Sequence, residues 1–275
     1  MSESSDADSI RQEHARTVPD AETIYESVRE RYAEIALSSG CGCGPSCCDG
    51  ASAAGTSLEL GYGLDDVAAV PEGANMGLGC GNPQAIAALQ AGETVLDLGS
   101  GGGFDCFLAA RQVGGAGAVI GVDMTPAMVA KARRNAELGP YENVDFRLGE
   151  IENLPVRDES IDCIISNCVI NLSPHKERVF QEAFRVLKSG GRLAISDIVA
   201  TAAFPDDLRQ DMNLLTGCMA GASLTWDLES ALKRAGFQQI KILPKSASQS
   251  FIKTWAPGSN VSDYLVSATI EAVKP

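Results

Sequence analysis

Apolar runs alternate with amphipathic segments over most of the chain. Five short runs rich in Val, Ile and Leu are bounded by polar or Gly-rich stretches, which is typical of buried strands. Helices are expected between them, so that the chain forms βαβ units around a mostly parallel central sheet. The pattern predicts an open α/β fold with strands at Thr94–Gly99, Ala118–Asp123, Val144–Gly149, Ile161–Asn167 and Gly191–Val199.

The segments between these strands carry helix signals. A helix is expected over Gly103–Val113, and another begins after Thr125, with Pro126 at its first position, and closes at Gly139. A third is expected to run from Ser173 to about Leu187, and Asn82-Pro83 opens a short one.

The two ends of the chain extend this plan. Ile24, Val28, Tyr32 and Ile35 recur at helical spacing after Asp20, which predicts an N-terminal helix that ends near Ser38–Gly40. Residues 40–57 are rich in Cys, Gly, Ser and Ala without a period, so a mobile loop is expected. Beyond the core we expect helices at Pro205–Leu215 and Trp226–Ala235, then an antiparallel sheet edge from strands near Gln238–Leu243 and Asp263–Val273.

Charge and composition narrow the partners. The net charge of −14 disfavours nucleic acid and anionic membrane surfaces, which attract basic proteins. The N-terminal residues lack the apolar region of a signal peptide, and no run of about 18 apolar residues exists to span a membrane. We therefore expect a cytoplasmic protein. Nine cysteines in a reducing compartment indicate metal binding or redox chemistry rather than a disulfide framework.

A Gly-rich turn follows the first predicted strand. "VLDLGSGGG" places Asp97, Gly99, Gly101 and Gly103 between that strand and a helix, where a ligand can approach the backbone and the free N–H groups. Asp123 ends the next strand, where an acidic side chain can hold ribose hydroxyls. A tight loop and a helix-capping aspartate are the alternatives, but the pairing favours a binding site.

The glycine spacing is G-x-G-x-G, not the dinucleotide spacing G-x-G-x-x-G. Together with "GVDMTPAM", "GEIENLPV" and "RVLKSGGRL", it resembles class I S-adenosylmethionine (SAM)-dependent methyltransferases, which implies their Rossmann-like fold. The resemblance also implies that Asp123 binds the ribose, that Glu150 and Ile151 lie beside the adenine, and that Gly99 and Gly101 face the methionine part. Other cofactor contacts are then expected from Asp97, Ser100, Met124 and Asn167.

Three cysteines lie in connections that this fold brings to one rim. Cys168 comes just after the fourth strand, where ligands bind in open α/β sheets. Cys80 precedes the first strand, and Cys218 lies in a Gly- and Ala-rich loop after the fifth. The three thiols would suit a soft, thiophilic ion. Cys106 and Cys163, inside a predicted helix and strand, are expected to pack in the core.

The stretches "GLGCGNP", "SNCVINL" and "GCMAGA" together resemble arsenite methyltransferases of the prokaryotic type. The resemblance implies that arsenite and methylarsenite are substrates, that Cys168 and Cys218 hold As(III), and that Cys80 joins them or acts as a redox partner. Family proposals supply electrons from enzyme thiols, with Cys80–Cys168 as the candidate pair here and thioredoxin or glutathione as reductant. On this resemblance, residues 1–57 hold the N-terminal helix and Cys-rich segment, residues 58–204 the SAM-binding core, and residues 205–275 the acceptor loop, helices and sheet edge.

The missing bases agree with this chemistry. Most O- and N-methylations use a general base, yet the chain has only His14, in the polar N-terminus, and His175, expected to be a solvated first-turn residue. Arsenic(III) keeps a lone pair and needs no base. Trp226 and Trp255 are interpreted as packing residues.

Two other functions remain open. A SAM-dependent C-methyltransferase of quinone biosynthesis would share the cofactor motifs but has no use for the three cysteines. A non-enzymatic metal-binding protein would use "CGCGPSCC", that is Cys41, Cys43, Cys47 and Cys48. In the arsenite enzyme we expect this segment to capture As(III) loosely rather than to react.

Overall fold

The computed structural model describes residues 19–38, 53–202, 204–256 and 260–275. The four cysteines of "CGCGPSCC" and His14 lie outside these ranges, so their predicted roles stay predictions. No helix of the described part is long and apolar enough to cross a membrane.

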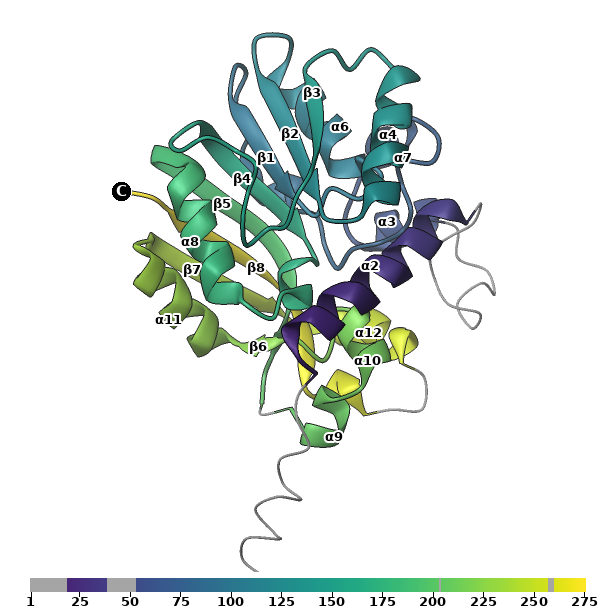
Figure 1. Cartoon of the computed structure of the whole chain (residues 1–275), viewed down its shortest axis with the longest axis vertical. Helices are drawn as coiled ribbons and strands as arrows, with labels where there is room; N and C mark the ends of the chain where they lie inside the picture. Colours follow the sequence, from purple (N-terminus) through teal and green to yellow (C-terminus); the bar gives the residue numbers. More distant parts are fainter. Residues whose placement is uncertain (1–18, 39–52, 203, 257–259) are drawn as a thin grey trace, which may run out of the picture.

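A mixed sheet forms the centre of the molecule (Figure 1). In the described residues it has eight strands, with the order β3-β2-β1-β4-β5-β8-β7, and β6 pairs with the end of β5. The strands β1 to β5 are parallel, whereas β8 is antiparallel to both β5 and β7. The predicted α/β fold with an antiparallel C-terminal edge is thus confirmed. The strands are β1 Thr94–Leu98, β2 Ala118–Asp123, β3 Val144–Leu148, β4 Ile161–Asn167, β5 Leu187–Ala200, β6 Ser223–Leu224, β7 Gln238–Lys245 and β8 Leu265–Val273.

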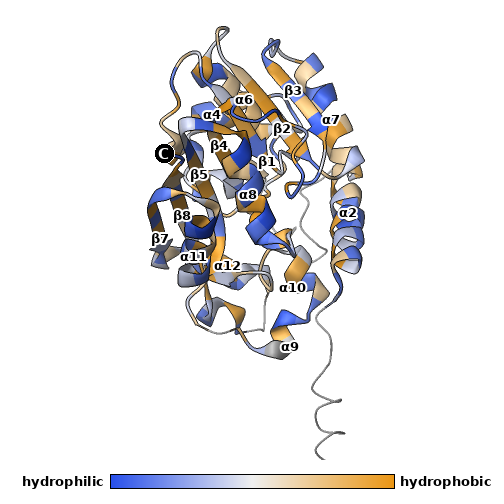
Figure 2. Cartoon of the chain, turned by 60° about the vertical axis from the view of Figure 1, so that its left-hand side comes forward, coloured by the Kyte–Doolittle hydropathy of each residue, from blue (hydrophilic) through white to orange (hydrophobic). Residues whose placement is uncertain are grey.

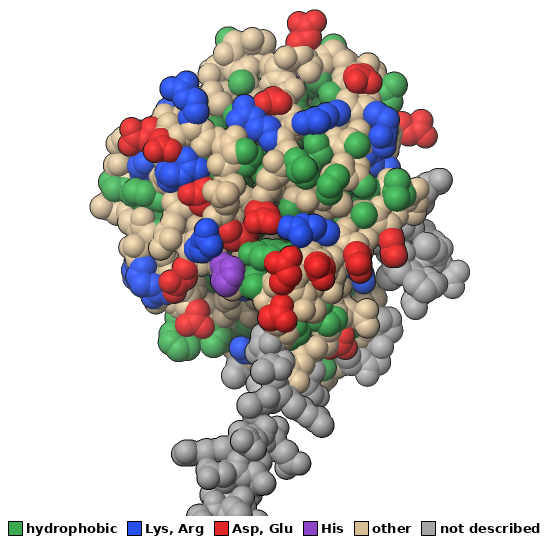
Figure 3. All heavy atoms as spheres, viewed as in Figure 1, with side chains coloured by type: hydrophobic (Ala, Val, Ile, Leu, Met, Phe, Trp, Pro, Cys, Tyr) green, Lys and Arg blue, Asp and Glu red, His purple; other side chains and the backbone are tan. Residues whose placement is uncertain are grey.

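Helices cover both faces of the sheet. One face packs against α8 (Lys176–Val186) and α11 (Thr225–Ala235), and the other against α6 (Phe104–Val113) and α7 (Pro126–Glu137). Figure 2 shows hydrophobic residues along the strands and hydrophilic ones on the outer sides of the helices. Acidic and basic side chains are interspersed over the face in Figure 3.

A further hydrophobic cluster lies beyond the carboxyl ends of β4 and β5. It joins the N-terminal helix α2 (Ala21–Leu37) to α10 (Met212–Thr216) and α12 (Gln249–Trp255). Asp20 caps α2 by accepting a hydrogen bond from the Thr23 amide at 2.9 Å. The fold thus brings helices from both ends of the chain to one place. The same cluster contains the three cysteines that the sequence singled out, Cys80, Cys168 and Cys218.

Some predicted elements differ from the observed ones. The helix expected over Pro205–Leu215 is two short helices, α9 (Asp206–Arg209) and α10, because Asp211 caps the second by accepting from the Asn213 and Leu214 amides. Residues 53–57, expected to belong to a loop, lie in the short helix α3 (Ala53–Glu59). The only buried side chain of α3, Ser57, donates a hydrogen bond to Asn75. The helix is therefore held by tertiary contacts, and its sequence has no apolar periodicity that would predict it.

Other boundaries moved by a few residues. A 3₁₀ turn at Ile170–Leu172 precedes α8, which begins at Lys176 rather than at Ser173. Trp226, interpreted as packing, is 63% exposed, because α11 turns Leu228, Ala231 and Leu232 toward the core instead. The remaining helices are α4 Leu64–Ala68, α5 Gln84–Ala87 and the 3₁₀ turns Ser246–Ser248 and Val261–Asp263.

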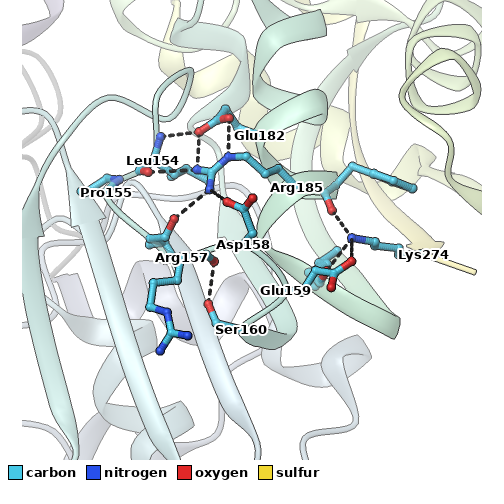
Figure 4. A network of polar contacts seen from close by, with 12 residues as sticks. Leu154, Pro155, Arg157, Asp158, Glu159, Ser160, Glu182, Arg185 and Lys274 are labelled. Atoms are coloured by element: carbon cyan, nitrogen blue, oxygen red, sulfur yellow. Dashed lines mark hydrogen bonds and ion pairs between the residues drawn. The ribbon is translucent and has the colours of Figure 1, made fainter.

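Arg185 fastens the segment between β3 and β4 to α8 (Figure 4). Its guanidinium donates to both carboxylate oxygens of Glu182 at 2.7 Å and to the carbonyls of Leu154 and Val156 at 3.1 and 2.9 Å. Glu182 in turn accepts from the Leu154 amide at 2.7 Å. Hydrogen bonds from Arg185 lower the pKa of Glu182 below its usual value, although burial opposes this.

We expect Glu182→Gln to lower the free energy of unfolding by about 1 kcal/mol at pH 7, since it removes the charge that Arg185 binds. A carboxyl whose pKa is lowered by folding stabilises the protein above its unfolded pKa and loses this effect as the pH falls through its folded pKa. The difference from wild type should therefore shrink below about pH 4.3. Urea unfolding between pH 7 and pH 3 measures it, and Asp158→Asn, on the 74% exposed partner of Arg185, is the control with a smaller effect. A difference that stays constant across this range would contradict the assignment.

Candidate active site

A cavity of about 480 Å³ opens at the carboxyl ends of the parallel strands. The glycine turn after β1 forms one part of its wall, and the loops after β4 and α10 form another. Helix α2 contributes Tyr25, Val28 and Tyr32. Most residues predicted to bind a ligand line this one cavity, namely Asp97, Gly99, Ser100, Gly101, Asp123, Met124, Ile151, Asn167, Cys168 and Cys218.

The glycine turn needs its glycines. Gly99 has a φ of 69°, and a Cβ there would come within 2.4 Å of the Val169 side chain. Gly101 has a φ of 51° with open space where a side chain would be, so its backbone is accessible to a ligand. The buried Ser100 hydroxyl has no hydrogen-bond partner among the described residues. A buried polar group without a partner is uncommon, and this one lies in the cavity wall.

Asp123 holds the glycine turn in place. Its carboxylate accepts from the Gly101 amide at 2.9 Å and from the Thr125 amide at 2.8 Å. Burial raises its pKa, and these two hydrogen bonds oppose the rise.

Glu150, in contrast, is not among the residues that line the cavity and forms an ion pair with Arg29 of α2 at 2.5 Å. Its predicted contact with adenine stays a prediction.

Asn167 connects β4 to the segment that carries Cys80. Its side-chain oxygen accepts from the Cys80 amide at 3.0 Å, and its nitrogen donates to the Gly81 carbonyl at 2.9 Å and the Tyr62 hydroxyl at 3.0 Å. Tyr62 donates to Asp105, whose pKa burial raises to about 6. Asp97 is also buried, and its pKa is well above the usual value for the same reason. Asn167 therefore fixes one of the cysteine segments beside the cavity.

The three cysteines do come together. Cys168 and Cys218 line the cavity, and the Cys218 thiol donates to the Cys168 carbonyl at 2.7 Å. Cys80 is buried behind them, with its sulfur, the Cys168 sulfur and a carboxylate oxygen of Asp197 all within 4.8 Å of one another. Cys106 and Cys163 are fully buried in the core, as predicted.

Both cysteines of the cavity wall have a left-handed backbone. Cys168 has a φ of 61° and Cys218 a φ of 62°, a conformation that is uncommon for residues other than Gly, Asn and Asp. Such strain persists only where the surroundings determine it, and it clusters at functional sites.

Asn171 and Asp197 hold the two strained turns. Asp197 accepts from the Ile170 amide at 3.0 Å and from the Asn171 side chain at 2.9 Å, next to Cys168. The Asn171 nitrogen also lies 3.4 Å from the Cys218 carbonyl. A Cβ at Gly221 would lie 2.0 Å from the Asn171 carbonyl oxygen, so the Cys218 loop approaches this far only because Gly221 lacks a side chain.

Two charged groups lie near the thiols, of which Asp197 is buried and Lys176 half-buried. Burial raises the pKa of Asp197 to about 6 and lowers that of Lys176 to about 8, and each charge partly offsets the shift of the other. Lys176 donates to the Ser223 hydroxyl at 2.9 Å and to the Gly221 carbonyl, which anchors the Cys218 loop. Sequence reasoning missed both residues, although Asp197 lies in "AISDIV", near the end of a predicted strand.

Burial and mutual contacts raise the pKa values of all three thiols of the cluster. Burial raises the pKa of Cys80. The contact with Cys168 and burial put the pKa of Cys218 well above its usual value. For Cys168, the contact with Cys218 lowers the pKa, but the contact with Cys80 and burial outweigh it.

Helix α2 closes the cavity over the cysteines. The Tyr25 hydroxyl donates to Glu152 at 2.9 Å, and the Tyr32 hydroxyl lies 3.8 Å from the Cys218 sulfur. Trp255, interpreted as a packing residue, also lines the cavity. The helical period of the N-terminal segment predicted α2 but gave no sign that Tyr32 would reach Cys218.

Comparison with known proteins agrees with this site. A family model described as a methyltransferase domain matches residues 89–243. A curated arsenite methyltransferase from Halobacterium salinarum is 56% identical over 265 residues, which cover 93% of this chain and 68% of that protein. The chain belongs to the arsenite methyltransferase family. It spans about two thirds of the length of the first two curated relatives that it matches.

A solved structure of the same family has a similar fold. The crystal structure of an arsenic(III) S-adenosylmethionine methyltransferase from Chlamydomonas reinhardtii superposes with a TM-score of 0.60 at 34% identity, over 81% of this chain and 73% of that one. A ubiquinone/menaquinone biosynthesis C-methyltransferase from Salmonella arizonae is 35% identical over only 39% of this chain and 43% of its own length. The similarity to arsenite methyltransferases thus extends well beyond the part shared with that other class.

The strain at Cys168 gives a stability prediction that is independent of activity. We expect Cys168→Gly to be more stable than Cys168→Ala by about 1 kcal/mol, because Gly adopts a left-handed backbone without strain. At Cys163, inside β4 and without a positive φ, the order should reverse, with Gly less stable than Ala by about 0.5–1 kcal/mol. Chemical denaturation of the four variants measures both differences. If Ala is more stable than Gly at both positions, the backbone of Cys168 is not strained.

Proposed function

We propose that this protein transfers methyl groups from SAM to trivalent arsenic held by Cys168, Cys218 and Cys80. The observation that carries the proposal is the shared cavity: two strained, thiol-bearing turns and an accessible glycine turn line the same space. Membership of the arsenite methyltransferase family supports it.

The glycine turn fits the cofactor. The open space at Gly101, the unpaired Ser100 hydroxyl and the carboxylate of Asp123 offer backbone, donor and acceptor groups to a nucleoside with an amino acid attached. Met124 and Ile151 supply apolar wall beside them. When bound, SAM supplies an electrophilic methyl group that needs no further activation.

The thiols suit arsenite as the substrate. Sulfur ligands prefer soft ions, and the three thiols start protonated. Each thiol proton combines with one hydroxyl of arsenite and leaves as water, so three As–S bonds form without a general base. The only described histidine, His175, is exposed at the start of α8, which agrees with a reaction that needs no general base.

The cysteines orient the reaction and then return its electrons. Thiolate-bound arsenic(III) keeps a lone pair, and the cavity directs it toward the methyl donor. Methylation raises arsenic formally to the pentavalent state. An S–S bond between Cys80 and Cys168 then forms as their two As–S bonds break, and the electron pair left on arsenic restores the trivalent state. A hydroxide from water, which gives up its other proton to solvent, completes the third bond of arsenic and balances the charge brought by the methyl group. A thiol reductant reopens this disulfide by exchange.

We expect Cys168→Ser and Cys218→Ser each to lose arsenite methylation, because a hydroxyl is a poor ligand for a soft ion. Both variants should still bind SAM. Cys80→Ser should retain activity on an already methylated arsenical, which needs fewer thiol ligands. Incubation with labelled SAM, arsenite and a thiol, followed by identification of the methylated arsenic species, measures these losses. Cys163→Ala is the control, and full turnover by either serine variant would remove that cysteine from the site.

We expect Asp123→Ala to weaken SAM binding about 10- to 100-fold, because the loss of charge-assisted hydrogen bonds amounts to about 1.5–3 kcal/mol. The variant should stay folded, since Asp123 is only half-buried. Titration calorimetry measures the affinity. Asp145→Ala, on the exposed side of β3, is the matched control. An unchanged SAM affinity would exclude Asp123 from the cofactor site.

A further inference from the structure

A second cavity, of about 560 Å³, reaches Cys80 from another part of the surface. Its rim includes the exposed residues Glu59, Lys245 and Thr254, and its floor is formed by Cys80, Gly81 and Ser267. Among the described residues, none lines both this cavity and the cofactor cavity. The two spaces are therefore separate.

Cys80 and Cys168 lie between the two cavities. Cys168 lines the cofactor cavity, Cys80 lines the second one, and their sulfur atoms are within 4.8 Å of each other. A disulfide between them would therefore lie between the two cavities, with the Cys80 residue in the lining of the second one.

The surroundings of Cys80 suit a sulfur that is attacked and later released. The Ser196 hydroxyl is fully buried beside the Cys80 thiol, and no other described group forms a hydrogen bond with it. A Cβ at Gly81 would lie 2.1 Å from this hydroxyl, so Gly81 leaves room for it. Ser196 is placed to donate a hydrogen bond to a Cys80 thiolate. Ser267 fixes the backbone by donating to the Cys80 carbonyl at 2.7 Å.

Size and charge indicate the kind of reductant. Cys80 is only 1% exposed and lies at the floor of a cavity of about 560 Å³, so a reductant has to enter this cavity to approach it. A small thiol fits this volume, whereas a folded protein does not. Lys245 and Glu59 at the rim match the carboxylate and the ammonium group of an amino-acid-derived thiol.

We propose that the second cavity admits a low-molecular-weight, carboxylate-bearing thiol, which reduces a Cys80–Cys168 disulfide without passing through the cofactor cavity. This inference rests on the proposed function, in which turnover creates that disulfide.

The exchange takes place in two steps. The thiolate of the first reductant molecule attacks the Cys80 sulfur, a mixed disulfide forms, and Cys168 is released as a thiolate toward the cofactor cavity. A second reductant molecule attacks the sulfur of the first, so Cys80 is released beside Ser196. Two small thiols become one disulfide, and the two electrons restore both cysteines. The thiol cluster is thereby reduced while the cofactor cavity stays occupied.

The test uses the full-length protein oxidised chemically, with the Cys80–Cys168 linkage verified by peptide mass spectrometry. Glutathione is the probe, and the rate at which the two thiols reappear is measured. Thr254→Trp narrows the cavity and is expected to slow this reduction at least about ten-fold, since exchange depends on access to the attacked sulfur. Lys253→Trp, its exposed neighbour outside the lining, should reduce at the wild-type rate.

A charge variant tests the kind of thiol. Lys245→Glu should slow reduction by glutathione about five-fold at low salt and leave reduction by neutral 2-mercaptoethanol unchanged. Lys241→Glu, exposed on the same strand but outside the cavity, is the matched control.

The outcomes separate this inference from the proposed function. Equal glutathione rates in wild type and Thr254→Trp would overturn it, and so would fast reduction by thioredoxin in both while glutathione reacts slowly with wild type. Failure of oxidation to link Cys80 to Cys168 would also overturn it. A single round of methylation by the reduced protein tests the proposed function alone: it should proceed at the wild-type rate in Thr254→Trp, while glutathione-driven multiple turnover falls.

Discussion

The thiol site depends on the hydrogen bonds that the buried carboxylate of Asp197 accepts. Asp197 is 2% exposed, and it accepts hydrogen bonds from the Ile170 and Ile198 amides and from the Asn171 side chain. A carboxylate without such donors would be strongly destabilised by burial. With them, it holds the turn after β4 to the end of β5, and through Asn171 it reaches the loop that carries Cys218.

This arrangement explains how two cysteines keep a strained backbone. Each left-handed residue costs about 1 kcal/mol or more, and only surrounding contacts can maintain it. Asn171, Lys176 and the close approach at Gly221 provide those contacts from three separate elements. The thiol positions are thus set before any ligand arrives, which is what catalysis by alignment requires.

The sequence predicted the parts of the molecule that depend on local pattern. The strands have apolar runs, the glycine turn has a motif, and Cys168 follows a strand whose end is a binding position in this fold. The connections that carry Cys80 and Cys218 were expected at the same rim, and the resemblance added the roles of the three cysteines toward arsenic. The contacts between distant segments have no such signature: the Tyr32 hydroxyl reaches Cys218 from 186 residues away, and Asn167 fixes Cys80 from 87 residues away. Helix α12 has a single buried side chain, Ile252, so its sequence has no apolar periodicity that would predict the helix. The second cavity beside it could not be predicted for the same reason.

The protonation of the thiols connects binding to redox chemistry. Thiolates, rather than thiols, are oxidised and form disulfides, and the raised pKa values keep all three cysteines protonated in the absence of substrate. The raised pKa values therefore slow adventitious oxidation of Cys80 and Cys168, which lie close together. In the proposed function, binding of arsenic(III) replaces each proton by an As–S bond and so generates the reactive sulfur only where the substrate is present. In the proposed cycle the disulfide then follows methylation instead of competing with it, because the electrons leave the thiols only through arsenic.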